Sequence, residues 1–224
     1  MDIPGNISRR NWLVSGIHEK ELARAFSLYA GGRLLDIGCG DKPYGQLTAE
    51  YVSEHIGLDH DSSEHDLSRA DLIGTAYAIP LDDEHVDTVL CTAVLEHLEE
   101  PQDALREAYR VLKPGGYAIY TVPLFWHLHE EPRDFYRYTK HGLRYLFEKS
   151  GFTIVELKEM SGFWVTFGQE LVYYLWGLRG VGKFNPLRWI VPPLGAAIQG
   201  ICYLLDRIDH SPQFAWAYIL VARK

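Results

Sequence analysis

A carboxylate and two glycines follow the first apolar run of the chain, in residues 36–41 (DIGCGD). Two glycines separated by one residue allow a tight turn and let backbone N–H groups approach a ligand closely. Asp59 ends the next apolar run, about 20 residues downstream, where an acid can accept hydrogen bonds from both hydroxyls of an adenosine ribose. These residue types and their spacing favour a nucleoside-binding site, although the glycine turn alone is also typical of ordinary strand-to-helix connections.

The position of a third glycine would distinguish two classes of nucleotide-binding site. In a GxGxxG motif the third glycine allows close helix packing, and the helix N-terminus then holds a pyrophosphate. Pro43 stands at that position, with Gly45 close by. The sequence therefore favours an adenosyl ligand without a pyrophosphate, and a nucleotide-dependent oxidoreductase is the disfavoured alternative.

The apolar patterns around these residues predict alternating strands and helices. Helices are expected over residues 17–30 and 101–113, the second beginning at Pro101 and ending before Gly115 and Gly116. Such alternation predicts a parallel sheet covered on both faces, with ligands bound beyond the carboxyl ends of the strands. The expected strands are residues 33–37, 55–58, 71–73, 86–91, 117–122, 151–157 and 215–221.

Several segments, in this order, resemble class I S-adenosylmethionine-dependent methyltransferases, specifically the type 11 methyltransferase domain family. They are residues 34–40 (LLDIGCG), 57–59 (GLD), 74–76 (GTA) with 79–81 (IPL), 86–89 (VDTV), 94–98 (VLEHL) and 111–116 (VLKPGG). The combination is far more specific than any one part. The resemblance implies an α/β fold with a doubly wound, seven-stranded, mostly parallel sheet whose last strand is antiparallel, and S-adenosylmethionine as cofactor.

The resemblance also assigns roles to matching positions. The glycine turn and Asp36 would line the methionine end of the cofactor, Asp59 would hold the ribose, and the remaining residues would flank the adenine and the sulfonium. Thr75 is a departure, because the family often has Asp there as the partner of the adenine amino group. The implied cofactor-binding residues are Asp36, Gly38, Cys39, Gly40, Asp59, Thr75, Ala76, Thr92 and Ala93.

The segment after the fifth predicted strand, residues 122–139 (VPLFWHLHEEPRDFYRYT), is where acceptor-side groups are expected. Methyl transfer from a sulfonium mainly requires alignment, and a base is needed only for a protonated acceptor. We predict His129 as base or acceptor-binding group, because an unperturbed imidazole titrates near neutral pH, with Asp134 and Tyr136 in support. The alternative is that Asp134 and Arg137 only pair to order the loop.

No metal site is predicted from the sequence. The ligand-type residues of this segment match no specific site signature, so we expect solvated side chains there and at the other histidines named here. The residues considered are His127, His129, Glu131 and Asp134, together with His55, His60 and His65.

We predict one domain over residues 1–224: a helical lead (1–30), a cofactor-binding core (31–160), an apolar helical insert (161–212) and a final strand (213–224). Residues 189–205 carry no charge, but they are short for a membrane span and include Pro192 and Pro193. Arg179, Lys183 and Arg188, among aromatic side chains, suit helices that contact a bilayer through residues 163–205 or hold a lipid-like acceptor. A cap on the sheet, or on a second subunit in a homodimer, is the competing interpretation.

Composition limits the partners and the compartment. A net charge of −8 argues against nucleic-acid binding, and three cysteines without a CxxC pair suit a reducing compartment. No secretion signal is evident at the N-terminus, so a cytoplasmic protein, in which the insert can associate with a membrane, is expected. The functional hypothesis is in-line methyl transfer to a small-molecule or lipid- or sugar-linked acceptor, and the alternative is a non-catalytic module that binds S-adenosylmethionine or lipid.

Overall fold

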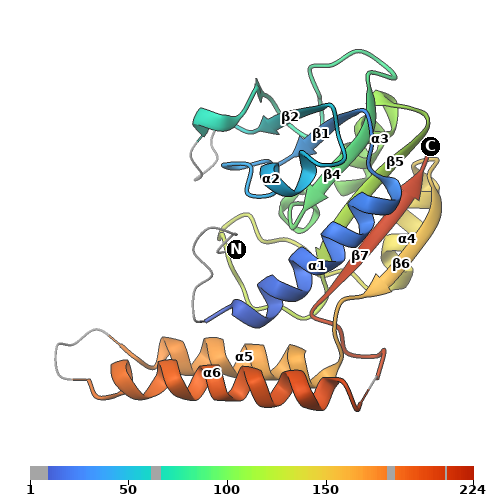
Figure 1. Cartoon of the computed structure of the whole chain (residues 1–224). Helices are drawn as coiled ribbons and strands as arrows, with labels where there is room; N and C mark the ends of the chain where they lie inside the picture. Colours follow the sequence, from blue (N-terminus) through green and yellow to red (C-terminus); the bar gives the residue numbers. More distant parts are fainter. Residues whose placement is uncertain (1–9, 62–66, 181–184, 210) are drawn as a thin grey trace.

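A single seven-stranded sheet organises the protein, with the strand order β3-β2-β1-β4-β5-β7-β6 (Figure 1). The computed structural model describes residues 10–61, 67–180, 185–209 and 211–224, so His65 and Lys183 lie outside the described residues. The strands are β1 (Arg33–Ile37), β2 (Glu54–Asp59), β3 (Leu72–Ile73), β4 (Val86–Thr92), β5 (Leu112–Pro123), β6 (Thr153–Glu159) and β7 (Ala217–Arg223).

Strand directions match the predicted fold. Neighbouring strands from β3 to β5 pair in parallel, whereas β7 is antiparallel to both β5 and β6. The order turns from β1 toward β2 on one side and toward β4 on the other, so the carboxyl ends of these strands border a shared crevice. The predicted doubly wound sheet, with only its last strand reversed, is therefore confirmed.

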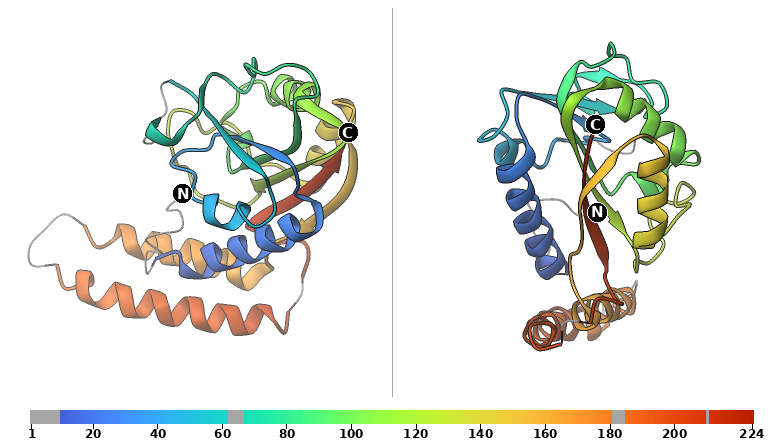
Figure 2. Two further views of the ribbon diagram at one scale, coloured as in Figure 1. Left: turned by 45° about the horizontal axis from the view of Figure 1, so that its top comes forward. Right: turned by 90° about the vertical axis from the view of Figure 1, so that its right-hand side faces the viewer.

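Helices cover both faces of the sheet. Helix α1 (Trp12–Tyr29) lies on one face, while α3 (Pro101–Val111) and α4 (Lys140–Lys149) lie on the other (Figure 2). Leu22 and Phe26 of α1 are fully buried, as are Leu105 of α3 and Phe147 of α4. The apolar stripes of these helices thus account for the two-sided core. Short helices complete the connections: α2 (Gly45–Thr48), η1 (Leu67–Arg69) and η2 (Leu95–His97).

Several predicted boundaries were wrong by a few residues because sheet pairing and burial outweigh local patterns. Helix α1 begins at Trp12 rather than residue 17, since Leu13 and Val14 are already buried. Helix α3 ends at Val111, because Leu112 pairs with Val86 in the sheet. Strands β6 and β7 both begin two residues later than predicted, and they end at residues 159 and 223.

The insert before β7 forms two long helices, α5 (Phe163–Gly177) and α6 (Leu187–Asp206), which lie side by side at one edge of the molecule (Figures 1 and 2). A Cβ atom on Gly168 of α5 would lie 2.3 Å from Sγ of Cys202, so the two helices approach closely there. The Leu13 N–H donates to Oε1 of Gln199 on α6 at 3.2 Å, which ties the pair to α1. The charge-free residues 189–205 are thus part of one continuous helix of 20 residues, which extends beyond that stretch at both ends.

Candidate active site

The turn after β1 depends on two glycines with left-handed backbone angles, φ +71° at Gly38 and +50° at Gly40. A Cβ atom at Gly38 would lie 2.4 Å from Cγ2 of Val94, closer than side chains approach one another. The N–H groups of Gly38 and Cys39 donate to the carbonyl of Leu58 at 2.9 and 3.1 Å. The sequence therefore requires glycine here both for the turn and for the close packing against the segment after β4.

Asp59 stands at the end of β2, beside this turn, because β1 and β2 run parallel and end at the same edge of the sheet. Its side chain is buried, and its Oδ2 accepts the Gly40 N–H at 2.7 Å while its Oδ1 accepts the His60 N–H at 2.7 Å. Each carboxylate oxygen has a second lone pair. The side chain can therefore fix the turn and still accept hydrogen bonds from a vicinal diol.

A pocket of about 460 Å³ lies at the carboxyl ends of β1, β2 and β4. Its volume is in the range of sites for small ligands and cofactors. The turn after β1, the end of β2, the segment after β3 and the end of β4 all contribute to its walls. All the residues predicted to bind the cofactor line it: Asp36, Gly38, Cys39, Gly40, Asp59, Thr75, Ala76, Thr92 and Ala93.

Asp36, predicted to line the methionine end of the cofactor, has an unexpected partner. Nε2 of His55 lies 3.0 Å from its Oδ2, and Nδ1 of His55 lies 3.0 Å from Oγ1 of Thr48. Burial raises the pKa of Asp36, and the hydrogen bond from His55 opposes that shift. The expectation that His55 is a solvated side chain was wrong, because its ring lies between the sheet and α2 and positions the Asp36 carboxylate.

The wall near the end of β4 contains a residue in an uncommon conformation. Ala93, directly after Thr92, has φ +52°, an angle that residues other than glycine seldom adopt. Its N–H donates to the carbonyl of Thr121 on β5 at 2.9 Å, which holds this conformation. Conformations of this kind cluster at ligand sites, where the surrounding structure fixes them.

Comparison with known proteins agrees with this geometry. The model of a family described as a methyltransferase domain matches residues 35–120. Residues 35–120 belong to the type 11 methyltransferase domain family. The predicted family is thereby confirmed, and the matched segment contains the carboxyl end of every strand that borders the pocket.

Two relatives and one solved structure illustrate the similarity of the methyltransferase domain. A probable S-adenosylmethionine-dependent methyltransferase of Mycolicibacterium smegmatis is 32% identical over 127 residues, which cover 54% of this chain and 49% of the relative. A demethylmenaquinone methyltransferase of Staphylococcus carnosus is 24% identical over 72% of this chain and 86% of its own. The fold resembles an S-adenosylmethionine-dependent methyltransferase from Archaeoglobus fulgidus, with a TM-score of 0.62 at 19% identity over 96% and 97% of the two chains.

The predicted acceptor-side residues divide into two groups. Asp134 accepts hydrogen bonds from the His129 N–H at 2.9 Å and from both ends of the Arg137 guanidinium. Burial opposes its ionisation, but these hydrogen bonds prevail and lower the pKa of Asp134 to about 2. Asp134 therefore pairs with Arg137, as the alternative interpretation held, and it also positions His129. Tyr136 lies outside this group, since its hydroxyl donates to the Glu99 carbonyl at 3.0 Å and does not line the pocket.

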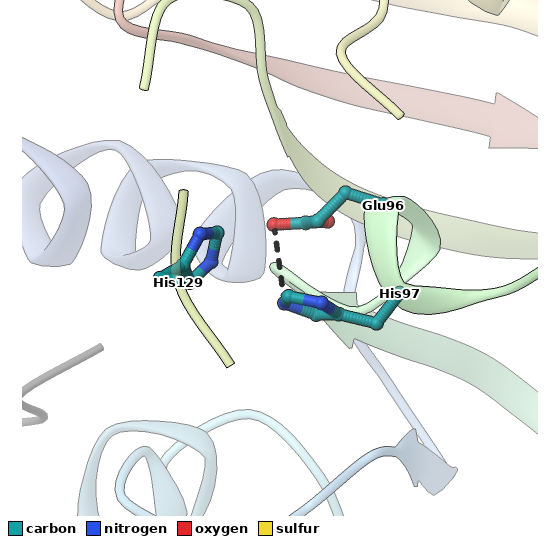
Figure 3. Close-up of side chains that lie close together, drawn as sticks. All are labelled: Glu96, His97 and His129. Carbon is teal, nitrogen blue, oxygen red and sulfur yellow. Dashed lines mark ion pairs between the residues drawn. The ribbon is translucent and has the colours of Figure 1, made fainter. Parts of the chain in front are cut away.

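His129 itself does not line the pocket and lies next to two residues to which the sequence assigned no role. Glu96 and His97 belong to η2, and the His97 and His129 rings are 4.8 Å apart (Figure 3). Burial raises the pKa of Glu96 to about 8, and burial together with the charge of His97 lowers the pKa of His129. His97 lines the pocket. The sequence does show Glu96 followed by His97 inside a segment that resembles the family, and this pair could have marked the site. Only the tertiary structure shows that Glu96 is buried.

The loop after β5 closes one side of the pocket through residues 130–133. Its backbone is attached to η2, because the N–H groups of Phe135 and Tyr136 donate to the Glu96 carbonyl at 3.0 and 3.2 Å. The hydroxyl of Tyr138 donates to the Leu95 carbonyl at 3.0 Å. These contacts bring the loop against the segment after β4, so that residues 130–133 lie beside the strand ends that form the pocket.

Proposed function

We propose that this protein transfers a methyl group from S-adenosylmethionine to an acceptor that carries an apolar, lipid-like part. The observation that carries the proposal is the pocket at the strand ends, where the glycine turn and Asp59 lie together. Asp59 would accept the ribose hydroxyls, and Asp36 and the turn after β1 would contact the methionine end. The sulfonium activates its own methyl group, so the chain mainly has to align the acceptor atom, the methyl carbon and the sulfur.

The α5–α6 pair supports an acceptor of this class. Large apolar side chains are exposed along it, among them Trp189 at 85%, Tyr174 at 67% and Leu204 at 60%. Exposed apolar area of this extent is typical of surfaces that meet a lipid or another protein. The Staphylococcus carnosus relative is named for demethylmenaquinone, which gives one precedent for a specific acceptor in a similar chain.

We further propose that α6 rests on a bilayer surface. Among the described residues, α6 is the one helix long and apolar enough to cross a membrane by length and composition, with a mean hydropathy of 1.2 over 18 residues. Only 22% of that stretch is buried, so it differs from a core helix. Arg179 lies 4.4 Å from the Trp176 ring, an arrangement of cation and aromatic side chain that suits a lipid headgroup region. The alternative is that a second copy of the chain covers the exposed face of α6 in a homodimer.

The decisive experiment measures S-adenosylhomocysteine formed by the full chain with a panel of acceptors. The panel contains hydroxylated aromatic rings with and without an isoprenoid tail, and Asp59→Ala serves as the control variant. Product that depends on acceptor and on Asp59, with the tailed compounds preferred, would support the proposal. Tight S-adenosylmethionine binding without turnover of any acceptor would favour a binding module, and binding of NAD instead would overturn the cofactor assignment.

A further inference from the structure

A cluster of ligand-type side chains borders the cofactor pocket. Glu96, His97 and His129 each offer one such atom, and these atoms all lie within 4.8 Å of one another (Figure 3). Nε2 of His97 lies 4.0 Å from Oε1 of Glu96. Two of the residues come from η2, whereas His129 comes from the loop after β5.

The cluster contains buried polar atoms that lack hydrogen bonds. Among the residues that the structure describes, neither carboxylate oxygen of Glu96 nor Nε2 of His97 has a hydrogen-bond partner. The Glu96 residue is fully buried. Leaving such groups unpaired is costly, so a concentration of them in one place requires an explanation. A cation among them would satisfy all three atoms.

His97 is oriented as metal-binding histidines usually are, and Nδ1 of His129 has carbonyl and carboxylate neighbours together with the Arg137 guanidinium at 3.4 Å. Nδ1 of His97 lies 2.5 Å from the Arg133 carbonyl, to which it can donate. Nδ1 of His129 lies 3.2 Å from the His127 carbonyl and 3.4 Å from Oδ2 of Asp134. Metal-binding histidines almost always donate their second ring N–H to a carbonyl or carboxylate, which leaves the other nitrogen for the ion. Nε2 is the remaining nitrogen on each ring.

We propose that Glu96, His97 and His129 bind a divalent first-row transition-metal ion through the Glu96 carboxylate and the two Nε2 atoms. Two imidazoles and one carboxylate suit ions such as Zn²⁺, Co²⁺ and Fe²⁺, and such a set leaves coordination positions open. Ligand atoms about 2.1 Å from a shared ion lie at most about 4.2 Å apart. Around a tetrahedral ion they lie about 3.4 Å apart, so binding requires the widest spacing of the cluster, up to 4.8 Å, to close by about 1.4 Å through rotation of the side chains.

The open positions of this site would face the pocket, because His97 lines it. Oε2 of Glu130 lies 3.6 Å from Nε2 of His97 and could supply a fourth ligand. The role of the ion in methyl transfer rests on the proposed function: the ion would bind an oxygen of the methyl acceptor and hold that oxygen beside the sulfonium. Metal binding itself does not depend on that function.

The test is binding of metal alone to the full chain after treatment with a chelator. Zn²⁺ is titrated by calorimetry, and Co²⁺ by its visible absorbance, which reports nitrogen and oxygen coordination. We expect one ion per chain. Glu96→Gln, His97→Gln and His129→Gln should each weaken Zn²⁺ binding at least about tenfold, since loss of even an outer partner costs 10- to 100-fold. His141→Gln, on the exposed side of α4, is the matched control and should bind as the wild type does.

Two readouts keep folding and function apart from metal binding. Thermal unfolding without metal identifies any variant that fails to fold, and Zn²⁺ should raise the Tm of the wild type but not of folded Glu96→Gln. S-adenosylmethionine affinity, measured on the same samples, tests the cofactor pocket independently. The proposal is overturned if the wild type binds no Zn²⁺ or Co²⁺, or if folded Glu96→Gln binds them as tightly as the wild type.

Discussion

The backbone N–H of Gly40 donates a 2.7 Å hydrogen bond to Oδ2 of Asp59, which joins the turn after β1 to the end of β2. The carboxylate thus fixes the turn before any ligand binds, and it faces the pocket with lone pairs to spare. Pre-positioning of this kind lowers the cost of ordering groups on binding. The pairing of Gly40 with Asp59 therefore predicts that the stability of the turn and the affinity for the cofactor change together.

Asp59→Ala should weaken S-adenosylmethionine binding by roughly 10- to 100-fold, because hydrogen bonds to a charged group contribute about 1.5–3 kcal/mol. Calorimetric titration of the purified chain measures this change. Asp41→Ala is the control, since Asp41 is exposed beside the same turn and does not line the pocket. Equal affinities of wild type and Asp59→Ala would show that Asp59 does not hold the ribose.

Gly38→Ala should lower the free energy of unfolding by about 1–3 kcal/mol, because the new methyl group would overlap Val94 in a backbone conformation that favours glycine. Cofactor affinity should fall as well, since the turn must shift. Urea unfolding and calorimetry provide the two measurements. Gly31→Ala is the matched control, because a Cβ atom there meets nothing within 4 Å. A stable Gly38→Ala variant with unchanged affinity would contradict the close packing described for this turn.

His18 predicts a dependence of stability on pH. Its ring is buried between the Tyr44 hydroxyl, 2.8 Å from Nδ1, and the Thr121 hydroxyl, 2.9 Å from Nε2. Burial lowers the pKa of His18 from 6.5 to about 4. The unfolded chain therefore binds a proton that the folded chain excludes, so stability is fully present above pH 6.5 and falls as pH drops toward 4.

Between pH 7 and 5 this single group should contribute a loss of about 2 kcal/mol. Chemical unfolding at both pH values, for the wild type and for His18→Gln, isolates the contribution, because all other titrations are shared. The variant should be less sensitive to acid by that amount. Parallel pH profiles for the two proteins would mean that His18 is accessible to protons in the folded state.

Trp189→Asp in α6 should reduce binding to phosphatidylcholine–phosphatidylglycerol vesicles in a flotation assay, because the ring is 85% exposed on the face proposed to meet lipid. Leu28→Asp in α1 provides the control, as Leu28 is 60% exposed and lies near the C-terminal end of α1, whereas the α6 contact of this helix is made by Leu13 near its start. Equal flotation of all three proteins would remove the membrane proposal. A wild type that forms dimers and a Trp189→Asp variant that does not would instead identify a subunit interface.

The residues that line the pocket could be predicted from sequence because they are local features of strand ends. Asp36 is the penultimate residue of β1 and Asp59 is the last residue of β2, and parallel pairing of these strands brings both residues to one edge of the sheet. The contacts of the loop after β5 were predicted less completely. His129 and Asp134 do lie together, but the role of Tyr136 as an anchor on Glu99 depends on how the loop packs against η2.

The sequence by itself determined the fold class, the family and the residues that line the pocket, since periodicity and short motifs encode strands, turns and their ends. Only the tertiary structure decided that His55 pairs with Asp36, and that Glu96 and His97 meet His129 across the pocket edge. It also decided that α5 and α6 pack on each other and leave an apolar face exposed. The physical reason is that burial and contacts between distant segments depend on which faces pack together, and no local pattern of residues encodes that choice.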